Sequence, residues 1–200
     1  MEREHAPDLG PRGLFLVGFF FELGLVVIAA LLGYWSLGTP FPFRFVLDLR
    51  GSLWGLVATV PLLILAFVLT SKVGDRLPFL RRIEAKLKEF LSGGVCGMTA
   101  QEVVLLAAAA GVGEEILFRG VVQTLFERWG LLGASLIFGL LHAITPAYFV
   151  LAALLGLYLG WLYDATGNLL APMLVHWLYD AAALLLLRRK WRAEEEGTNG

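Results

Sequence analysis

The chain has 200 residues, of which 58% are hydrophobic and 16% are charged, and its mean hydropathy is +0.74. Soluble domains contain roughly 45–50% apolar and about 25% charged residues, so this composition excludes an ordinary soluble domain and indicates an integral membrane protein. The net charge of -1 gives no sign of a nucleic-acid partner, and the single cysteine, Cys96, excludes a disulfide framework and a thiolate zinc cluster.

Six apolar stretches follow one another along the chain, and a helix needs about 20 such residues to cross a bilayer. The fourth is short because Pro146 is expected to break the helix. The first is too long an apolar run for a signal peptide, so we expect it to remain in the protein. The predicted spans are residues 14–33, 53–70, 99–126, 131–144, 148–163 and 169–187.

These stretches predict an all-α, polytopic membrane helix bundle that forms a single domain over residues 1–200. Two N-terminal spans lie within residues 14–70, and four more make up a helical core at residues 99–187. We see no internal repeat and no second domain in this pattern.

Lys and Arg residues outside the spans are distributed unevenly, which predicts the orientation in the membrane. A cytoplasmic N-terminus places twelve of them in the cytoplasm and three on the opposite side. Six spans with both termini in the cytoplasm therefore satisfy the positive-inside rule. The cytoplasmic set is Arg3, Arg12, Lys72, Arg76, Arg81, Arg82, Lys86, Lys88, Arg188, Arg189, Lys190 and Arg192, and the opposite set is Arg44, Arg50 and Arg128.

An amphipathic helix is predicted at residues 78–92, between the second and third spans. Ile83 and Leu87 belong to its apolar side, whereas Glu84 is grouped with the basic residues on the other side. Such a helix can lie in the cytoplasmic interface near anionic headgroups, or it can cap the bundle as a solvated helix. The sequence favours neither alternative.

Two further segments are expected to lack regular structure. Gly93, Gly94 and Gly97 predict a flexible joint before the third span. Residues 188–200 are expected to form a cytoplasmic tail, whose end, RAEEEGTNG, has the composition of a disordered segment.

The motif EEILFR sets charged residues inside the apolar third span, where each charge costs about 2.5 to 3.5 kcal/mol at the bilayer centre. Glu115 and Arg119 are four residues apart and share one helix face, which predicts a structural ion pair. Gln123 continues the same stripe. Glu114 points about 100° away from this stripe, so we expect the two glutamates to have different roles.

Three more ionisable groups occur in later spans, namely His142 in the fourth and His176 with Asp180 in the sixth. A single histidine on an apolar face is more often a core residue than a site residue. Two histidines, an aspartate one turn away and an unpaired glutamate favour a shared polar pocket, because ionisable groups in membranes face the bundle interior. We therefore expect Glu114, His142, His176 and Asp180 to converge.

Two other acidic residues are expected to play no part in this pocket. Glu22 interrupts the first span, and the sequence identifies no partner for it. Asp164 lies at a predicted span end, where water and headgroups can solvate it.

Three motifs in successive helices, EEILFR, FGLLH and HWLYD, carry a family resemblance. They resemble the EExxxR, FxxxH and HxxxN/D motifs of the CPBP intramembrane metalloproteases, the family that includes type II CAAX prenyl endopeptidases and bacterial Abi proteins. The resemblance implies that Glu114 is the catalytic glutamate, that His142 is the histidine of the second motif, and that His176 and Asp180 are the final pair. The prenyl endopeptidases carry Asn where this chain has Asp180.

The resemblance implies peptide-bond hydrolysis, and these residue types suit that reaction. Glu114 can serve as the general base for a water held by His142, while His176 can donate a hydrogen bond to the oxyanion. An ionised Asp180 cannot donate, so it is expected to orient His176 or to bind a metal. Zinc with ligands among these four residues and a metal-free activated water are equally open, because the ligand types suit zinc but the HExxH spacing is absent.

The expected partners are the lipid bilayer and a peptide or protein substrate, which can itself be membrane-anchored. The expected location is a bacterial plasma membrane, and whether the substrate is prenylated stays open. A proton or ion pathway, or a non-catalytic scaffold that gives immunity to a peptide toxin, is the alternative. Transporters often contain repeated halves, and the lack of such symmetry in this chain favours the enzyme.

Overall fold

The structure is a computed structural model, and it describes residues 10–198. Every regular element in this range is a helix, so the predicted all-α fold is confirmed. The elements are α1 (Gly10–Leu37), α2 (Leu49–Thr70), α3 (Lys72–Arg76), α4 (Pro78–Val95), α5 (Ala100–Glu115), the π-helix η1 (Ile116–Val122), α6 (Gln123–Leu125), the 3-10 helix η2 (Glu127–Trp129), α7 (Gly130–Leu141), α8 (Pro146–Thr166) and α9 (Leu170–Thr198).

Within the described residues, the helices α1, α2, α8 and α9 are long and apolar enough to cross a membrane. The number of candidate spans rises from 4 to 5 if α4 and the helical stretch from α5 to α6 together form one bent span. The predicted count of six is not confirmed. The fourth predicted span is the weakest, because the 12 residues of α7 extend over about 18 Å, whereas a bilayer core is about 30 Å thick.

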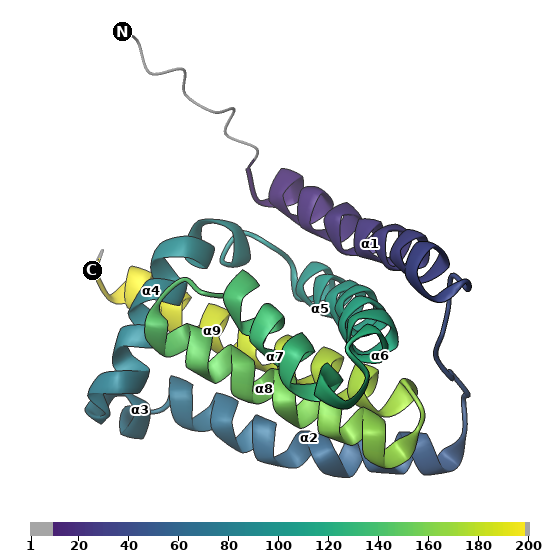
Figure 1. The fold of residues 1–200 in the computed structure, drawn as a ribbon. Helices are drawn as coiled ribbons and strands as arrows, with labels where there is room; N and C mark the ends of the chain where they lie inside the picture. Colours follow the sequence, from purple (N-terminus) through teal and green to yellow (C-terminus); the bar gives the residue numbers. More distant parts are fainter. Residues whose placement is uncertain (1–9, 199–200) are drawn as a thin grey trace, which may run out of the picture.

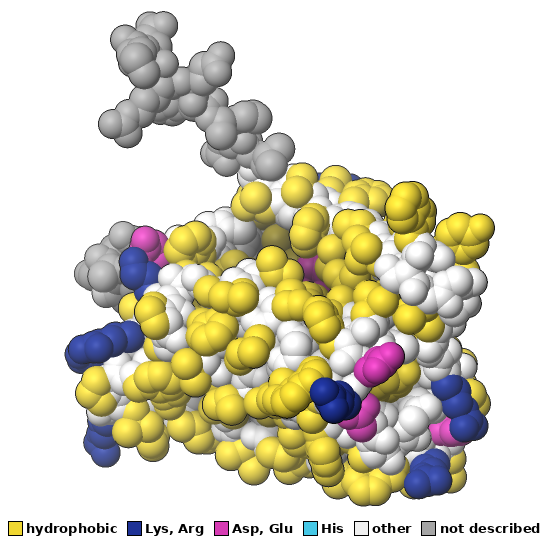
Figure 2. All heavy atoms as spheres, in the orientation of Figure 1, with side chains coloured by type: hydrophobic (Ala, Val, Ile, Leu, Met, Phe, Trp, Pro, Cys, Tyr) yellow, Lys and Arg dark blue, Asp and Glu magenta, His cyan; other side chains and the backbone are white. Residues whose placement is uncertain are grey.

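The outer surface carries the apolar residues that a lipid environment requires. Phe20, Phe21 and Trp35 of α1, for example, are all more than half exposed. Figure 2 shows apolar side chains over most of the face in view, charged side chains toward its ends, and an acidic group at the edge of a hollow beside α1. The protein is therefore an integral membrane protein.

Helix α9 lies at the centre of the bundle and positions the residues it carries among several neighbours. It packs against α2, α5 and α8, while α1 covers the other side of α5 and α7 packs on α8 (Figure 1). A polar side chain in the middle of α9 therefore faces protein rather than lipid.

Three segments that are distant in sequence meet at one end of the bundle. Pro11, at the start of α1, lies against Gly97 in the turn between α4 and α5. Arg192, near the end of α9, donates hydrogen bonds to the carbonyl oxygen of Cys96 in the same turn.

Helix α4 packs onto the bundle through a face that the sequence predicted only in part. Ile83 and Leu87 are buried, as their apolar side predicts. Glu84 is buried too, and its carboxylate accepts hydrogen bonds from Lys190 Nζ at 2.8 Å and Trp191 Nε1 at 3.2 Å. Its predicted place among the solvated residues is therefore wrong, because α9 supplies both donors.

The flexible glycine joint is wrong in its position. Gly93 and Gly94 lie within α4, which continues to Val95. The chain instead bends by 117° between α4 and α5, where Thr99 begins the next helix as its N-cap.

The predicted disordered tail is also helical as far as Thr198, where α9 ends. Trp191 is fully buried, and Lys88 of α4 forms an ion pair with Glu194 at 2.5 Å. These contacts with α4 explain why an acidic end of low hydrophobicity continues the helix. Arg3, which contributes to the predicted orientation, lies outside the described residues.

Candidate functional site

Close helix packing brings three elements together where the two glutamates lie. A side chain on Gly111 would meet the backbone nitrogen of Trp177 in α9 at 2.9 Å. A side chain on Gly113 would collide with the backbone carbonyl of Glu22 in α1. These glycines allow α9 and α1 to approach α5 directly before Glu114, and such close approach requires residues without a side chain.

The helix changes form directly after Glu115, where η1 begins as a π-helix. Its seven residues, Ile116–Val122, include Arg119. Single π-helical turns within α-helices frequently occur at functional sites.

One side of this segment forms a row of polar contacts with α8, which we name the polar seam. It consists of Glu115, Arg119 and Gln123 facing Gly156, Gly160 and Asp164. Arg119 Nη1 donates to Glu115 Oε1 at 2.8 Å, and both side chains are almost completely buried. Arg119 Nη2 donates to the carbonyl oxygen of Gly156 at 3.1 Å.

The far end of the polar seam gives Asp164 a protein partner. Gln123 Nε2 donates to the carbonyl oxygen of Gly160 at 3.2 Å and to Asp164 Oδ1 at 2.8 Å. Asp164 is exposed, as its predicted place at a span end requires, and the Gln123 amide reaches it across the helix interface in addition.

The aromatic ring of Phe138 connects the polar seam to His142. The Arg119 guanidinium lies 4.8 Å from the ring centroid of Phe138, and the His142 ring stacks on the same Phe138 ring with the centroids 4.4 Å apart. Cation–π contact of this kind stabilises a buried arginine.

His142 follows α7 directly and presents one ring nitrogen to Glu114. Its Nδ1 lies 2.8 Å from the carbonyl oxygen of Phe138, and since a carbonyl only accepts, Nδ1 carries the proton. In the neutral ring, Nε2 is then an acceptor, and it lies 3.7 Å from Glu114 Oε1. This separation is too long for a direct hydrogen bond and short enough for one water to bridge.

His176 is held between carboxylates on both sides of its ring. Nδ1 donates to Glu115 Oε1 at 2.7 Å, while Nε2 lies 3.3 Å from Asp180 Oδ2 and 3.8 Å from Glu114 Oε2. Glu115 therefore contacts both Arg119 and His176, a link that the single-helix argument for its ion pair did not reveal. The structure thus places Glu114, His142, His176 and Asp180 around one point.

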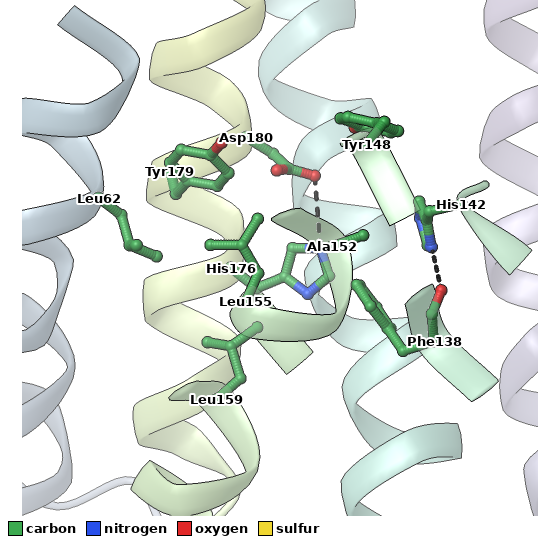
Figure 3. Close-up of a pocket in the computed structure, with 10 residues that line it drawn as sticks. All are labelled: Leu62, Phe138, His142, Tyr148, Ala152, Leu155, Leu159, His176, Tyr179 and Asp180. Atoms are coloured by element: carbon green, nitrogen blue, oxygen red, sulfur yellow. Dashed lines mark hydrogen bonds and ion pairs between the residues drawn. The ribbon is translucent and has the colours of Figure 1, made fainter. Parts of the chain in front are cut away.

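Two adjoining cavities open beside these side chains. The smaller has a volume of about 60 Å³ and is lined by His142, His176 and Asp180 with apolar neighbours (Figure 3). The larger has a volume of about 340 Å³, and its lining includes Glu114. Four residues line both cavities: His142, Tyr148, Tyr179 and Asp180.

Three polar side chains that the sequence did not assign to the site also line the large cavity. Glu22 is one of them, and its Oε2 is buried without a hydrogen-bond partner among the described residues. Tyr148 and Tyr179 are the others. Tyr179 directly precedes Asp180, which is a usable sequence signal, but no periodicity connects Glu22 or Tyr148 with the motifs.

The described residues do not form the ligand arrangement that the zinc alternative requires. Among residues 10–198, no group of three or more His, Cys, Asp or Glu side chains is arranged to hold a metal ion. The Nδ1 atoms of His142 and His176 already bond Phe138 and Glu115, so only their Nε2 atoms face the cavities.

Residues 97–182 match the sequence model of the family described as Type II CAAX prenyl endopeptidase Rce1-like. The predicted family resemblance is confirmed. The Rce1-like segment contains the four residues around the cavities and the polar seam.

A curated relative matches over a similar length. Over 89 residues the chain is 37% identical to a protein of Bacillus subtilis (strain 168) named "Uncharacterized protein YpbD". The match covers 43% of this chain and 46% of that protein, so the chain spans less than half of the relative's length. No solved structure matches the chain.

Proposed function

We propose that this protein is an intramembrane endopeptidase in which Glu114 and His142 activate a water for peptide-bond hydrolysis. One observation carries the proposal: Glu114 Oε1 and His142 Nε2, 3.7 Å apart, are both acceptors beside a cavity. A water between them donates both of its protons inward and turns its oxygen lone pairs toward a substrate. The similarity of residues 97–182 to a prenyl endopeptidase family supports the same reaction.

The reaction then needs only proton transfers on Glu114. The carboxylate takes a proton from the water while the water oxygen bonds to the scissile carbonyl carbon, whose π electrons move to the carbonyl oxygen. When the C–N bond breaks, the protonated Glu114 returns its proton to the leaving amine. One product is a carboxylic acid, the other is an amine, and the carboxylate is restored.

His176 is assigned to the negative oxygen of this intermediate. Because Nδ1 donates to Glu115, the ring offers an Nε2–H donor only when both nitrogens are protonated. Glu115 and Asp180 on either side of the ring supply the countercharge for that form. Asp180 therefore orients His176, a role that an acceptor can fill.

The large cavity supports a substrate with an apolar segment. Most of its lining is aliphatic, with Leu69, Leu87 and Leu187 among the residues that enclose it. An apolar peptide segment, or one anchored in the bilayer, fits such a lining better than a charged one. The matched family is described as a prenyl endopeptidase family, so a prenylated peptide is the substrate to test first.

We also propose that both termini face the cytoplasm of a bacterial cell. The start of α1 and the end of α9 both lie at the turn between α4 and α5. Helices α3 and α4 and the end of α9 lie toward this same end (Figure 1), and their sequences carry most of the basic residues, as a cytoplasmic location predicts.

The decisive test compares the purified protein with its Glu114→Gln variant. The probe is a quenched fluorescent peptide that ends in an S-farnesylated cysteine followed by three residues. We expect Glu114→Gln to lower kcat by about 10²- to 10⁴-fold, because the amide cannot accept the proton of the water.

Glu102→Gln is the matched control, since Glu102 lies in the same helix but forms an exposed capping box with Thr99. Glutamine also serves in a capping box, so this variant should cleave like the parent. If Glu114→Gln cleaves the peptide as fast as Glu102→Gln, the endopeptidase assignment is wrong.

A further inference from the structure

The residues around the cavities offer few hydrogen-bond donors for the oxyanion of the reaction intermediate. Glu22, Glu114 and Asp180 are carboxylates that border the large cavity. His142 turns an acceptor toward Glu114, and the Nε2 of His176 lies 3.3 Å from Asp180 Oδ2. The one assigned donor is thus shared with an acceptor before any substrate arrives.

Two hydroxyl groups are available at the same place. Tyr148 and Tyr179 line both cavities together with His142 and Asp180. Neither hydroxyl has a hydrogen-bond partner within residues 10–198. Figure 3 shows them on opposite sides of Asp180, with Tyr148 on the side of His142 and Tyr179 on the side of Leu62.

The position of Tyr148 in the fold favours it over Tyr179. Its backbone nitrogen donates to the N-cap side chain of Thr145 at 3.0 Å, which fixes it in the first turn of α8. Its ring packs against the buried cluster formed by α2, α4 and α9, whereas the ring of Tyr179 packs toward α2 and α8. The charge of Asp180 acts on the hydroxyls of both tyrosines, and the charge of Glu114 acts in addition on that of Tyr148.

We propose that the Tyr148 hydroxyl donates a hydrogen bond to the oxyanion and is a second catalytic donor beside His176. The inference rests on the proposed endopeptidase function. Tyr148 keeps its proton throughout: it stabilises the negative oxygen while the water adds, and it releases the oxygen when the carbonyl re-forms. The hydroxyl thereby supplies the donor that a carboxylate at Asp180 cannot provide.

The test compares Tyr148→Phe with Tyr179→Phe on the same S-farnesylated quenched peptide. Both variants lose one hydroxyl that lines the same cavities. We expect Tyr148→Phe to lower kcat by about 10²-fold, as loss of one oxyanion donor does elsewhere, with little change in KM. Tyr179→Phe should lower kcat far less than Tyr148→Phe does, and both variants should melt within about 2 °C of the parent.

A second variant separates donation from a structural role. Asp180→Asn places an amide donor next to His176, so in this background Tyr148→Phe should lower kcat by a smaller factor than it does in the parent. An equal factor in both backgrounds, a kcat of Tyr148→Phe close to that of the parent, or an equal loss in Tyr179→Phe would overturn the inference.

Different results would disprove the proposed function and the role of Tyr148. If Glu114→Gln cleaves as well as the parent, or if the parent cleaves nothing, the function fails and this inference fails with it. If Glu114→Gln is inactive and Tyr148→Phe is fully active, the function stands and only the role of Tyr148 is wrong.

Discussion

The polar seam and the lining of the large cavity begin at adjacent residues, Glu115 and Glu114, but the two glutamates differ in how closely they contact other polar groups. In the polar seam, Glu115 and Arg119 are 2.8 Å apart and almost completely buried. At the cavities, Glu114 lies 3.7 Å from His142 and 3.8 Å from His176, beyond direct hydrogen-bond distance. Neighbouring glutamates are thus either bound to protein or left facing a space that water and substrate can enter.

This difference separates stability from chemistry within one helix. A buried charge pair is strongly destabilising to break, because the remaining partner stays buried without compensation. A carboxylate without a direct partner stabilises the fold little, but it is free to accept a proton. We therefore expect substitutions in the polar seam to change the free energy of unfolding and substitutions at the cavities to change turnover.

Replacement of Glu115 by alanine should give the largest loss of stability. It removes the partner of Arg119 and the acceptor of His176 Nδ1 in one step. We expect the free energy of unfolding to fall by about 3–5 kcal/mol, measured by denaturant titration in detergent micelles. The parallel Glu114→Gln variant should unfold with at least the free energy of the parent, because Glu114 Oε2 is buried without a hydrogen-bond partner among the described residues, and the comparison fails if these two variants lose equal stability.

Replacement of Gly160 by alanine should have an intermediate effect. The new methyl group would lie 2.6 Å from both Gln123 Oε1 and Leu131 Cδ1, so the ends of these two side chains must move and the hydrogen bonds of Gln123 in the polar seam are disturbed. Overpacking of this kind costs about 1–3 kcal/mol. Gly24 of α1 is the matched control, because nothing lies within 4 Å of an added side chain there.

Thermal unfolding of the two glycine variants gives the measurement. Gly24→Ala should raise stability slightly, since alanine favours the helix more than glycine does. An unfolding free energy of Gly160→Ala at or above that of the parent would show that the polar seam is loosely packed.

The sequence predicted the features that depend on one helix or on composition. The all-α membrane fold follows from apolar content, and the pairing of Glu115 with Arg119 follows from their four-residue spacing. The convergence of the four motif residues was an expectation from the cost of charge in a membrane, and the structure places those side chains together. Their catalytic role stays a proposal.

Features that depend on contacts between distant segments could not be predicted in this way. Glu84 is buried because Lys190 and Trp191, over a hundred residues later, reach it from α9. The end of α9 is helical for the same reason, because its residues contact α4, a distant segment of the chain. Tyr148 lines the cavity because the chain turns between His142 and Thr145, the N-cap of α8. The hydrophobic pattern of the sequence does not predict the course of this turn.

Replacement of Glu22 by glutamine should have the smallest effect, and the opposite sign. Glu22 Oε2 is buried without a hydrogen-bond partner among the described residues, so this carboxylate weakens the fold rather than supporting it. An unpaired buried polar group costs about 1–3 kcal/mol, and Glu22 is only partly buried, so an uncharged amide should raise the free energy of unfolding by about 1 kcal/mol or less. Glu102→Gln, at an exposed position, should leave it unchanged. A clear loss of stability in Glu22→Gln would mean that the cavity side of the bundle depends on its carboxylates as the polar seam does, and the contrast between the two regions would disappear.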